Sequence, residues 1–91
     1  MTDQEKSIWR GAFDLYDWNK DMPNTDQSWR GFITSLTAYA NKYDWRECPL
    51  SHRLADAVLL AVEDEVKKRI KAEEEAARQP SQMSFFEEAY P

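Results

Sequence analysis

The sequence predicts an all-α protein, a small three-helix bundle with a long third helix and a C-terminal tail. Two observations lead to this prediction: apolar residues recur every three or four positions in three separate segments, and helix-breaking residues separate those segments. No segment alternates apolar and polar residues as a half-buried strand would. Ninety-one residues make one domain with a modest core, to which four Trp, four Tyr and four Phe bring large side chains. We expect the bundle to span residues 1–72, with a projecting helix end and tail over residues 73–91.

The first helix is expected over residues 3–20. Thr2 and Glu5 have the spacing of a capping box, in which each side chain accepts a hydrogen bond from the other residue's backbone. Residues 21–24, which include Pro23, interrupt the apolar pattern and end this helix. Its apolar residues at helical spacing are Ile8, Trp9, Ala12, Phe13, Leu15 and Tyr16.

The second helix is expected to start near Thr25 and to present one continuous apolar stripe. The stripe consists of Trp29, Phe32, Ile33, Leu36, Tyr39, Ala40 and Tyr43. Residues 44–49 then form a connection, in which Pro49 restricts Cys48 to an extended backbone.

The third helix is expected to have Ser51 as its N-cap and to project beyond the bundle. Its apolar stripe ends at Ile70, and residues 71–78 are charged residues and alanine. That segment predicts a semi-rigid spacer of ~12 Å, and we expect Pro80 to end the helix. The buried face is predicted to consist of Leu54, Val58, Leu59, Val62, Val66 and Ile70. Three acid–base pairs at i,i+4 are expected to support the helix, Glu63–Lys67, Asp64–Lys68 and Glu65–Arg69.

The two glycines of the chain, Gly11 and Gly31, both follow a Trp-Arg dipeptide inside a predicted helix. Glycine in a helix interior costs ~1 kcal/mol relative to alanine. We therefore expect a compensating feature, either a close approach of two helix backbones or room for a tryptophan that lies across the neighbouring helix. A duplicated Trp-Arg binding surface is the alternative interpretation of the repeat.

Composition narrows the class of protein. The net charge of −5 leaves no basic face, so we expect no direct contact with nucleic acid. An acidic mimic of nucleic acid that inhibits a DNA-binding enzyme is one alternative. Cys48 is the only cysteine, which suits a reducing cytoplasm, and no apolar run is long enough for a membrane span. We expect a cytoplasmic protein that is monomeric or weakly oligomeric.

No group of residues predicts an enzyme, a cofactor or a metal site. Asp17, Asn19 and Asp21 resemble the start of a calcium-binding loop, but Met22 stands where the turn glycine belongs and Ser28 where the closing glutamate belongs. Cys48 and His52 are too few ligands for structural zinc, and nothing predicts a third group that would make them a nucleophile and its base.

The last ten residues contain Gln82-Met83-Ser84-Phe85-Phe86, whose two adjacent phenylalanines are unfavourable in water. The string resembles the peptide with which bacterial proteins bind the replication sliding clamp, a family of consensus Q-L-S/D-L-F. Gln82, Ser84 and Phe86 match it, Met83 is a conservative replacement, and Phe85 stands where the family has leucine. The archaeal and eukaryotic clamp box fits less well, because Gln82 would occupy its aliphatic position.

This resemblance implies a protein that acts by protein–protein contact in DNA replication or repair, or a phage or mobile-element protein that competes for the clamp. In such a complex Gln82 would bind at the rim of the clamp pocket, while Met83, Phe85 and Phe86 enter its apolar floor. The alternative is a small structural module whose aromatic tail packs on its own core.

Overall fold

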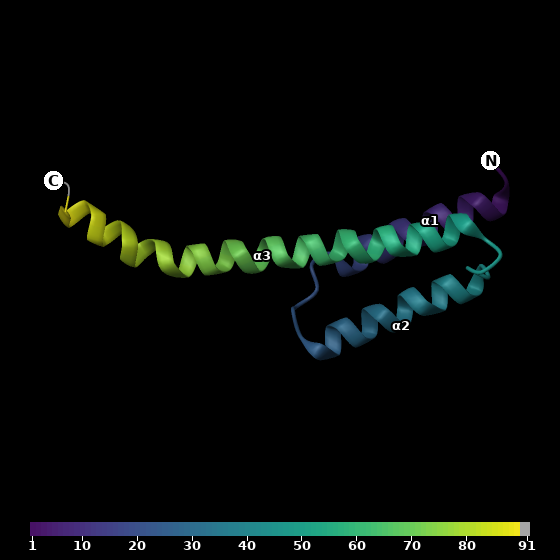
Figure 1. Cartoon of the computed structure of the whole chain (residues 1–91), viewed down its shortest axis with the longest axis horizontal. Coiled ribbons are helices and arrows are strands. Elements are labelled where there is room, and N and C mark those ends of the chain that lie inside the picture. Colours follow the sequence, from purple (N-terminus) through teal and green to yellow (C-terminus); the bar gives the residue numbers. More distant parts are fainter. Residues whose placement is uncertain (90–91) are drawn as a thin grey trace.

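The computed structural model describes the backbone of residues 1–89 and the side chains of residues 1–77. Its three helices are α1 (Asp3–Asn19), α2 (Asp26–Lys42) and α3 (Pro49–Ala89). α1 and α3 run in the same direction, α2 runs in the opposite direction, and α3 extends far beyond both (Figure 1). Residues 1–89 contain no strand. The predicted all-α three-helix bundle with a long third helix is confirmed.

The beginning of α1 is held by the predicted capping box. The Thr2 backbone N–H donates to Glu5 Oε1 at 2.8 Å, and the Glu5 N–H donates to Thr2 Oγ1 at 3.1 Å. The bond from the Thr2 backbone stabilises the ionised carboxylate and lowers the pKa of Glu5. At the other end α1 stops at Asn19, one residue short of the expected Lys20, and Asn19 Nδ2 donates to the carbonyl of Leu15 at 2.8 Å.

Both ends of α2 are capped by local hydrogen bonds. Thr25 is the N-cap, and its Oγ1 accepts from the Ser28 N–H at 3.2 Å. After Lys42 the chain reverses through Asp44, whose φ of 50° lies in the left-handed region. The N–H groups of Asp44 and Trp45 return to the carbonyls of Asn41 and Ala40, the bond pair of a Schellman motif.

The ends of α3 differ from the sequence prediction. The helix starts at Pro49, and Ser51 is fully buried in the first turn, where its hydroxyl donates to the Cys48 carbonyl at 3.1 Å. Proline suits the first helical position because the N–H that it lacks would have no helical partner there. At the other end, α3 continues through Pro80 to Ala89, although Pro80 removes one backbone hydrogen bond. A single missing bond is tolerated because the turns on either side remain helical.

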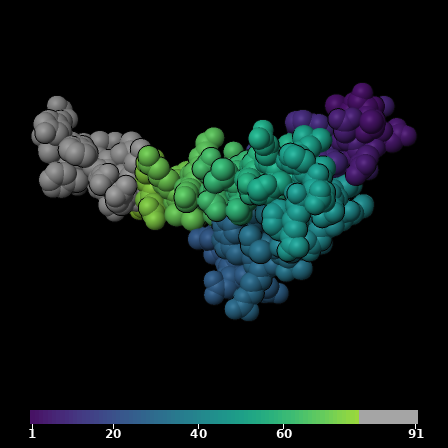
Figure 2. Space-filling view, turned by 45° about the vertical axis from the view of Figure 1, so that its right-hand side comes forward, coloured from purple at the N-terminus to yellow at the C-terminus, as the bar shows by residue number. Residues whose placement is uncertain are grey.

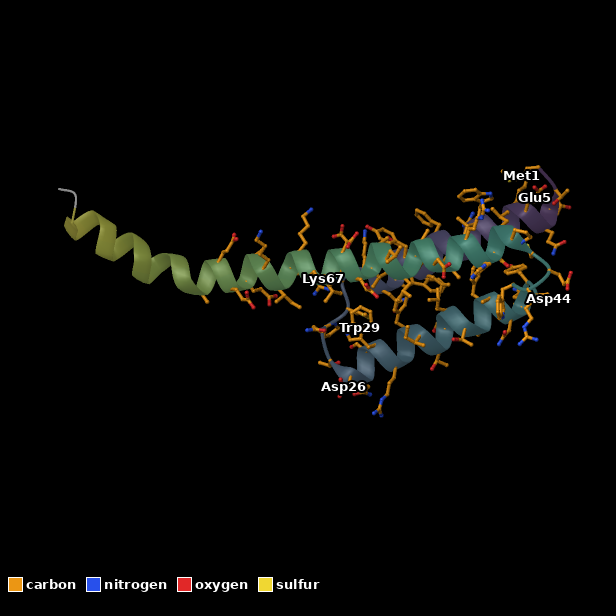
Figure 3. The ribbon with its side chains drawn as sticks, viewed as in Figure 1. Met1, Glu5, Asp26, Trp29, Asp44 and Lys67 are labelled. Carbon is orange, nitrogen blue, oxygen red and sulfur yellow. The ribbon has the colours of Figure 1, made fainter. Side chains whose placement is uncertain are left out.

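The core lies between the three helices and contains the predicted Leu36, Val58 and Val62. Met22 is also buried, although the sequence analysis placed it only in the helix-breaking connection. Trp9, Phe13 and Ile33 occur in the predicted apolar patterns, yet their side chains are 48%, 64% and 43% exposed. The complete buried set is Ile8, Ala12, Leu15, Met22, Phe32, Leu36, Tyr39, Ala55, Val58, Val62 and Val66. Trp29 packs at its edge, between the start of α2 and α3 (Figure 3).

The two glycines have different surroundings. A Cβ atom at Gly11 would lie 2.8 Å from Cε2 of Tyr39, whereas one at Gly31 would meet nothing within 4 Å. At Gly11 the missing side chain does make room for a ring of the neighbouring helix, but the ring is that of Tyr39 and not of a tryptophan, and the expectation is wrong for Gly31. No shared packing role explains the repeated Trp-Arg-Gly.

Arg69 ties α3 to the connection between α1 and α2. Its Nη2 donates to the carbonyls of Lys20 at 3.2 Å and Met22 at 2.6 Å, so it places positive charge at the C-terminal end of α1. The expected Glu65–Arg69 pair is replaced by these bonds. Among the side chains of residues 1–77, the ion pairs within 4.0 Å are Asp17–Lys20 and His52–Asp56, so the Glu63–Lys67 and Asp64–Lys68 pairs do not form either.

Candidate functional site

The predicted partner-binding residues Gln82, Met83, Ser84, Phe85 and Phe86 lie beyond residue 77, outside the side chains that the structure describes. What the structure does describe is the element that carries them. Every side chain from residue 71 to residue 77 is exposed, and the last described side chain of α3 that packs against the core is that of Ile70. α3 thus leaves the bundle as a single arm, which Figure 2 shows in green.

An apolar groove lies between α1 and α3, on a surface that the sequence analysis did not single out. It has a volume of about 310 Å³. It is lined by Trp9, Ala12, Phe13 and Tyr16 of α1 and by Leu54, Ala57, Val58 and Ala61 of α3. Ala57 and Ala61 are small, so they leave a furrow beside the larger side chains of Trp9 and Phe13.

The groove exposes large apolar side chains to water, which is unfavourable. Trp9 and Phe13 are about half or more exposed, and Leu60, one turn from Ala57 on α3, is 59% exposed. Contiguous exposed apolar groups of this kind mark interaction sites in soluble proteins. A sequence signal for it existed: Trp9 and Phe13 are four residues apart and lie beside, rather than on, the line of Ile8, Ala12 and Leu15.

Charged side chains make the two ends of the groove different. Lys6 and Arg10 lie three residues before Trp9 and Phe13, and Arg53 lies four residues before Ala57, so exposed basic groups flank the end where both helices begin. Glu5, at the same end, is engaged in the capping box. At the other end, Asp17 is paired with Lys20 at 3.3 Å.

Cys48 and His52 are close in sequence but are engaged separately. The Ser51 backbone N–H acts as a hydrogen-bond donor to the thiolate, which lowers the pKa of Cys48. His52 lies on the other side of the first turn, where its Nε2 is 3.5 Å from Asp56 Oδ2 and its ring is 5.4 Å from that of Trp45. No bond between the thiol and the imidazole is present in this part of the molecule.

The resemblance to a calcium-binding loop does not extend to the geometry. Asp17 and Asn19 belong to the last turn of α1, where Asp17 pairs with Lys20 and Asn19 bonds to Leu15. Of the side chains in residues 1–77, no three acidic, histidine or cysteine groups converge as a metal site requires.

Comparisons with known proteins give no family: no family model, no curated protein and no solved structure matches the chain. The described helices also include none that is both long enough and apolar enough to cross a membrane. Two surfaces of the described structure can contact a partner, the projecting arm of α3 and the α1–α3 groove.

Proposed function

We propose that the protein is a non-enzymatic cytoplasmic adaptor that binds a bacterial replication sliding clamp through residues 82–86. It would act in DNA replication or repair, or as a phage or mobile-element protein that competes for the clamp. One structural observation supports this proposal: α3 carries these residues on an arm whose described side chains make no contact with the bundle core beyond Ile70. A clamp-binding peptide has to reach a pocket on another protein, and an arm of this kind gives it that reach.

The distances suit such presentation. At ~1.5 Å per residue, ~18 Å of helix separates Ile70 from Gln82. A partner that holds the peptide would therefore not collide with α1 or α2, because α1 ends and α2 begins near the level where Lys67 is marked in Figure 3.

Binding would require residues 82–86 to leave the helix, because successive side chains of a helix point about 100° apart and Met83, Phe85 and Phe86 would not enter one pocket together. The cost of unwinding these last turns is small, since short stretches of isolated helix are marginally stable in water. Pro80 lowers the cost further because it already removes one helical hydrogen bond. The residues that dock would thus be released without disturbing the packed part of α3.

The test is fluorescence anisotropy with a labelled peptide of residues 81–90 and a purified bacterial sliding clamp. We expect weak, saturable binding, because a few buried side chains must offset the entropy of ordering the segment. Phe86→Ala should weaken binding most, since a large aromatic in a dry pocket is the usual anchor. Gln82→Ala should weaken it less, and Phe85→Leu should tighten it by restoring the consensus residue.

Glu88→Ala is the matched control, because it changes the same peptide outside the motif and should leave affinity unchanged. The full-length chain should bind the clamp with the same order of effects. Clamp binding that is absent, or that survives Phe86→Ala undiminished, would overturn the proposal.

A further inference from the structure

The α1–α3 groove exposes apolar side chains to water, and the C-terminal segment of the chain has a complementary composition. Residues 81–91 combine Phe85, Phe86 and Tyr90 with Glu87 and Glu88. The groove offers an apolar furrow beside Trp9 and Phe13, with the basic Lys6, Arg10 and Arg53 at one end. An acidic aromatic segment is complementary to such a surface in both apolar character and charge.

A chain cannot fill its own groove with this segment while α3 stays helical. Ala61, at the near end of the groove, and Pro80 are ~28 Å apart along the helix. Phe86 lies six residues beyond Pro80, a reach of ~20 Å even if those residues were fully extended. Phe86 would stop short of Ala61, so the segment that covers the groove must come from another molecule.

The projecting part of α3 is self-complementary in charge. Lys67, Lys68 and Lys71 precede Ala72, and three consecutive glutamates, residues 73–75, follow it. All of these side chains are exposed, and none has an ion pair within 4.0 Å among the described residues. Two copies of α3 that run antiparallel with a two-fold axis at Ala72 would place Lys71 of each copy opposite Glu73 of the other, with Lys68 one residue beyond the level of Glu75. Such a self-complementary patch is what a two-fold dimer requires.

The same register brings the C-terminal segment to the groove. In an antiparallel pair centred on Ala72, residues equally far before and after Ala72 face each other. Phe86 and Val58 are equally far from Ala72 in sequence, and Val58 lines the groove. The charge pattern and the position of the groove, which are independent features, therefore give one register.

The helix face also agrees. Ala61, Glu65, Lys68, Ala72 and Glu75 follow one another at spacings of four, three, four and three residues. This is the spacing of a stripe that stays on one side of a helix, so Lys68, Ala72 and Glu75 continue the side of α3 that borders the groove. Ala72 at the crossing point is small enough to let the two helices approach closely.

We propose that the protein forms a two-fold symmetric dimer, in which the α3 helices pair antiparallel about Ala72 and residues 81–90 of each copy fill the α1–α3 groove of the other. Each bundle then gains a fourth helix from its partner. Aromatic side chains bury ~150–250 Å² each. Each groove would bury Trp9 and Phe13 of one copy against Phe85 and Phe86 of the other. Trp9 and Phe13 are 48% and 64% exposed before the dimer forms. The aromatic area buried in the two grooves together then reaches the ~1,200 Å² at which specific interfaces begin.

Sedimentation equilibrium of the full chain tests this dimer. We expect a species of twice the 10.7 kDa chain mass that dissociates on dilution. Phe13→Ser and Phe86→Ser should each weaken the dimer at least tenfold, and thermal melts should show that Phe13→Ser, at an exposed position, keeps the fold. A monomer at ~100 μM, where weak specific dimers are already populated, would overturn the proposal.

A charge exchange tests the register. Lys68 lies four residues before Ala72 and Glu75 three residues after it, so each Lys68 lies within one residue of the level of the other copy's Glu75. Lys68→Glu and Glu75→Lys should each weaken the homodimer several-fold at low salt, because each change brings two pairs of like charges close together. An equimolar mixture of the two variants should recover the wild-type association, since both facing pairs become opposite in sign. Lys67→Glu is the matched control, because it has the same charge change on a different side of α3 and should weaken the dimer less than Lys68→Glu.

A mixture that stays as weak as the two single variants would exclude the Ala72 register. These measurements use the protein without a clamp, so they test the dimer independently of the proposed clamp binding. If both proposals hold, the clamp and the second copy compete for residues 82–86, and added clamp should dissociate the dimer.

Discussion

Tyr39 of α2 lies across Gly11 of α1 and fixes how closely the two helices pack. The ring leaves no room for a Cβ atom at residue 11, where Cε2 and Cδ2 would be 2.8 and 3.1 Å away. Beyond the ring, the Tyr39 hydroxyl donates to the carbonyl of Ile8 at 2.8 Å. The hydrogen bond holds the ring in place, so the ring cannot easily move aside for a larger residue.

Alanine substitutions at the two glycines should have opposite effects. Gly11→Ala should lower the free energy of unfolding by ~1–3 kcal/mol, because the new methyl group overlaps the anchored ring of Tyr39. Gly31→Ala should raise it by ~0.5–1 kcal/mol, because alanine favours the helix and has open space around it. Chemical denaturation of the two variants checks both signs. Stabilisation by Gly11→Ala would show that the ring is free to move.

Removal of the Tyr39 hydroxyl should destabilise the bundle in a pH-dependent way. Tyr39→Phe loses one buried hydrogen bond and should cost ~0.5–1.5 kcal/mol near neutral pH. Burial raises the pKa of Tyr39 from 10.0 to about 12. A folded-state pKa above the unfolded value means that the neutral form stabilises the fold below pH 10 and that this stabilisation is lost as the pH rises toward 12.

The difference in stability between wild type and Tyr39→Phe should therefore shrink above pH 10. Denaturant titrations at several pH values between 8 and 11.5 measure that difference directly. A difference that stays constant over this range would mean that the hydroxyl is not buried as described.

The bonds from Arg69 to the α1–α2 connection should contribute measurably to stability. Arg69→Gln removes a charged donor from the carbonyls of Lys20 and Met22, and should cost ~1.5–3 kcal/mol. Lys67→Gln is the matched control, because it removes a positive charge from an exposed side chain of the same helix and should change stability by no more than ~0.5 kcal/mol. Equal effects in the two variants would mean that Arg69 acts only through its charge.

Much of this fold follows from local patterns in the sequence. The capping box at Thr2, the N-cap at Thr25 and the break around Pro23 predict helix ends to within a residue or two. Leu36, Val58 and Val62 were predicted to be buried from helical spacing alone, and they are. These features depend on residues that are near one another in sequence, which is why periodicity and capping rules predict them.

What the sequence did not predict depends on contacts between segments. Phe13 has the apolar character of a core residue, but α3 presents the small Ala57 and Ala61 opposite it, so its side chain stays exposed at a groove. Met22 was placed in a helix-breaking connection, yet that connection, held by Arg69, folds it into the core. Which helix faces which side chain is a property of the assembled bundle and not of one helix.

Alanine substitutions at two leucines, one buried and one exposed, should differ in their effect on the free energy of unfolding. Leu36→Ala removes a side chain that is 8% exposed and should cost ~2–5 kcal/mol through lost burial and the cavity left behind. Leu60→Ala removes the same atoms from a side chain that is 59% exposed and should change stability by no more than ~0.5 kcal/mol in the monomer. Thermal melts at low protein concentration check both values. No shift for Leu36→Ala would contradict the bundle itself.

The turn at the end of α2 should become more stable when Asp44 is replaced by glycine. Asp44 has a φ of 50°, a conformation that costs an L-residue more than it costs glycine, and the Schellman bonds at Ala40 and Asn41 require it. Asp44→Gly should therefore raise the free energy of unfolding by ~0.5–1 kcal/mol, whereas Asp44→Ala should lower it. Asp44→Asn removes the charge without a large conformational change and serves as the control for electrostatic effects.

Asp21→Gly is the matched control for glycine itself, because Asp21 lies in the other connection and has no positive φ. This change should not stabilise the fold, because glycine there only adds freedom to the unfolded chain. Denaturant midpoints of the four variants measure the effect, and stabilisation by Asp21→Gly equal to that by Asp44→Gly would show that the left-handed residue is not its source.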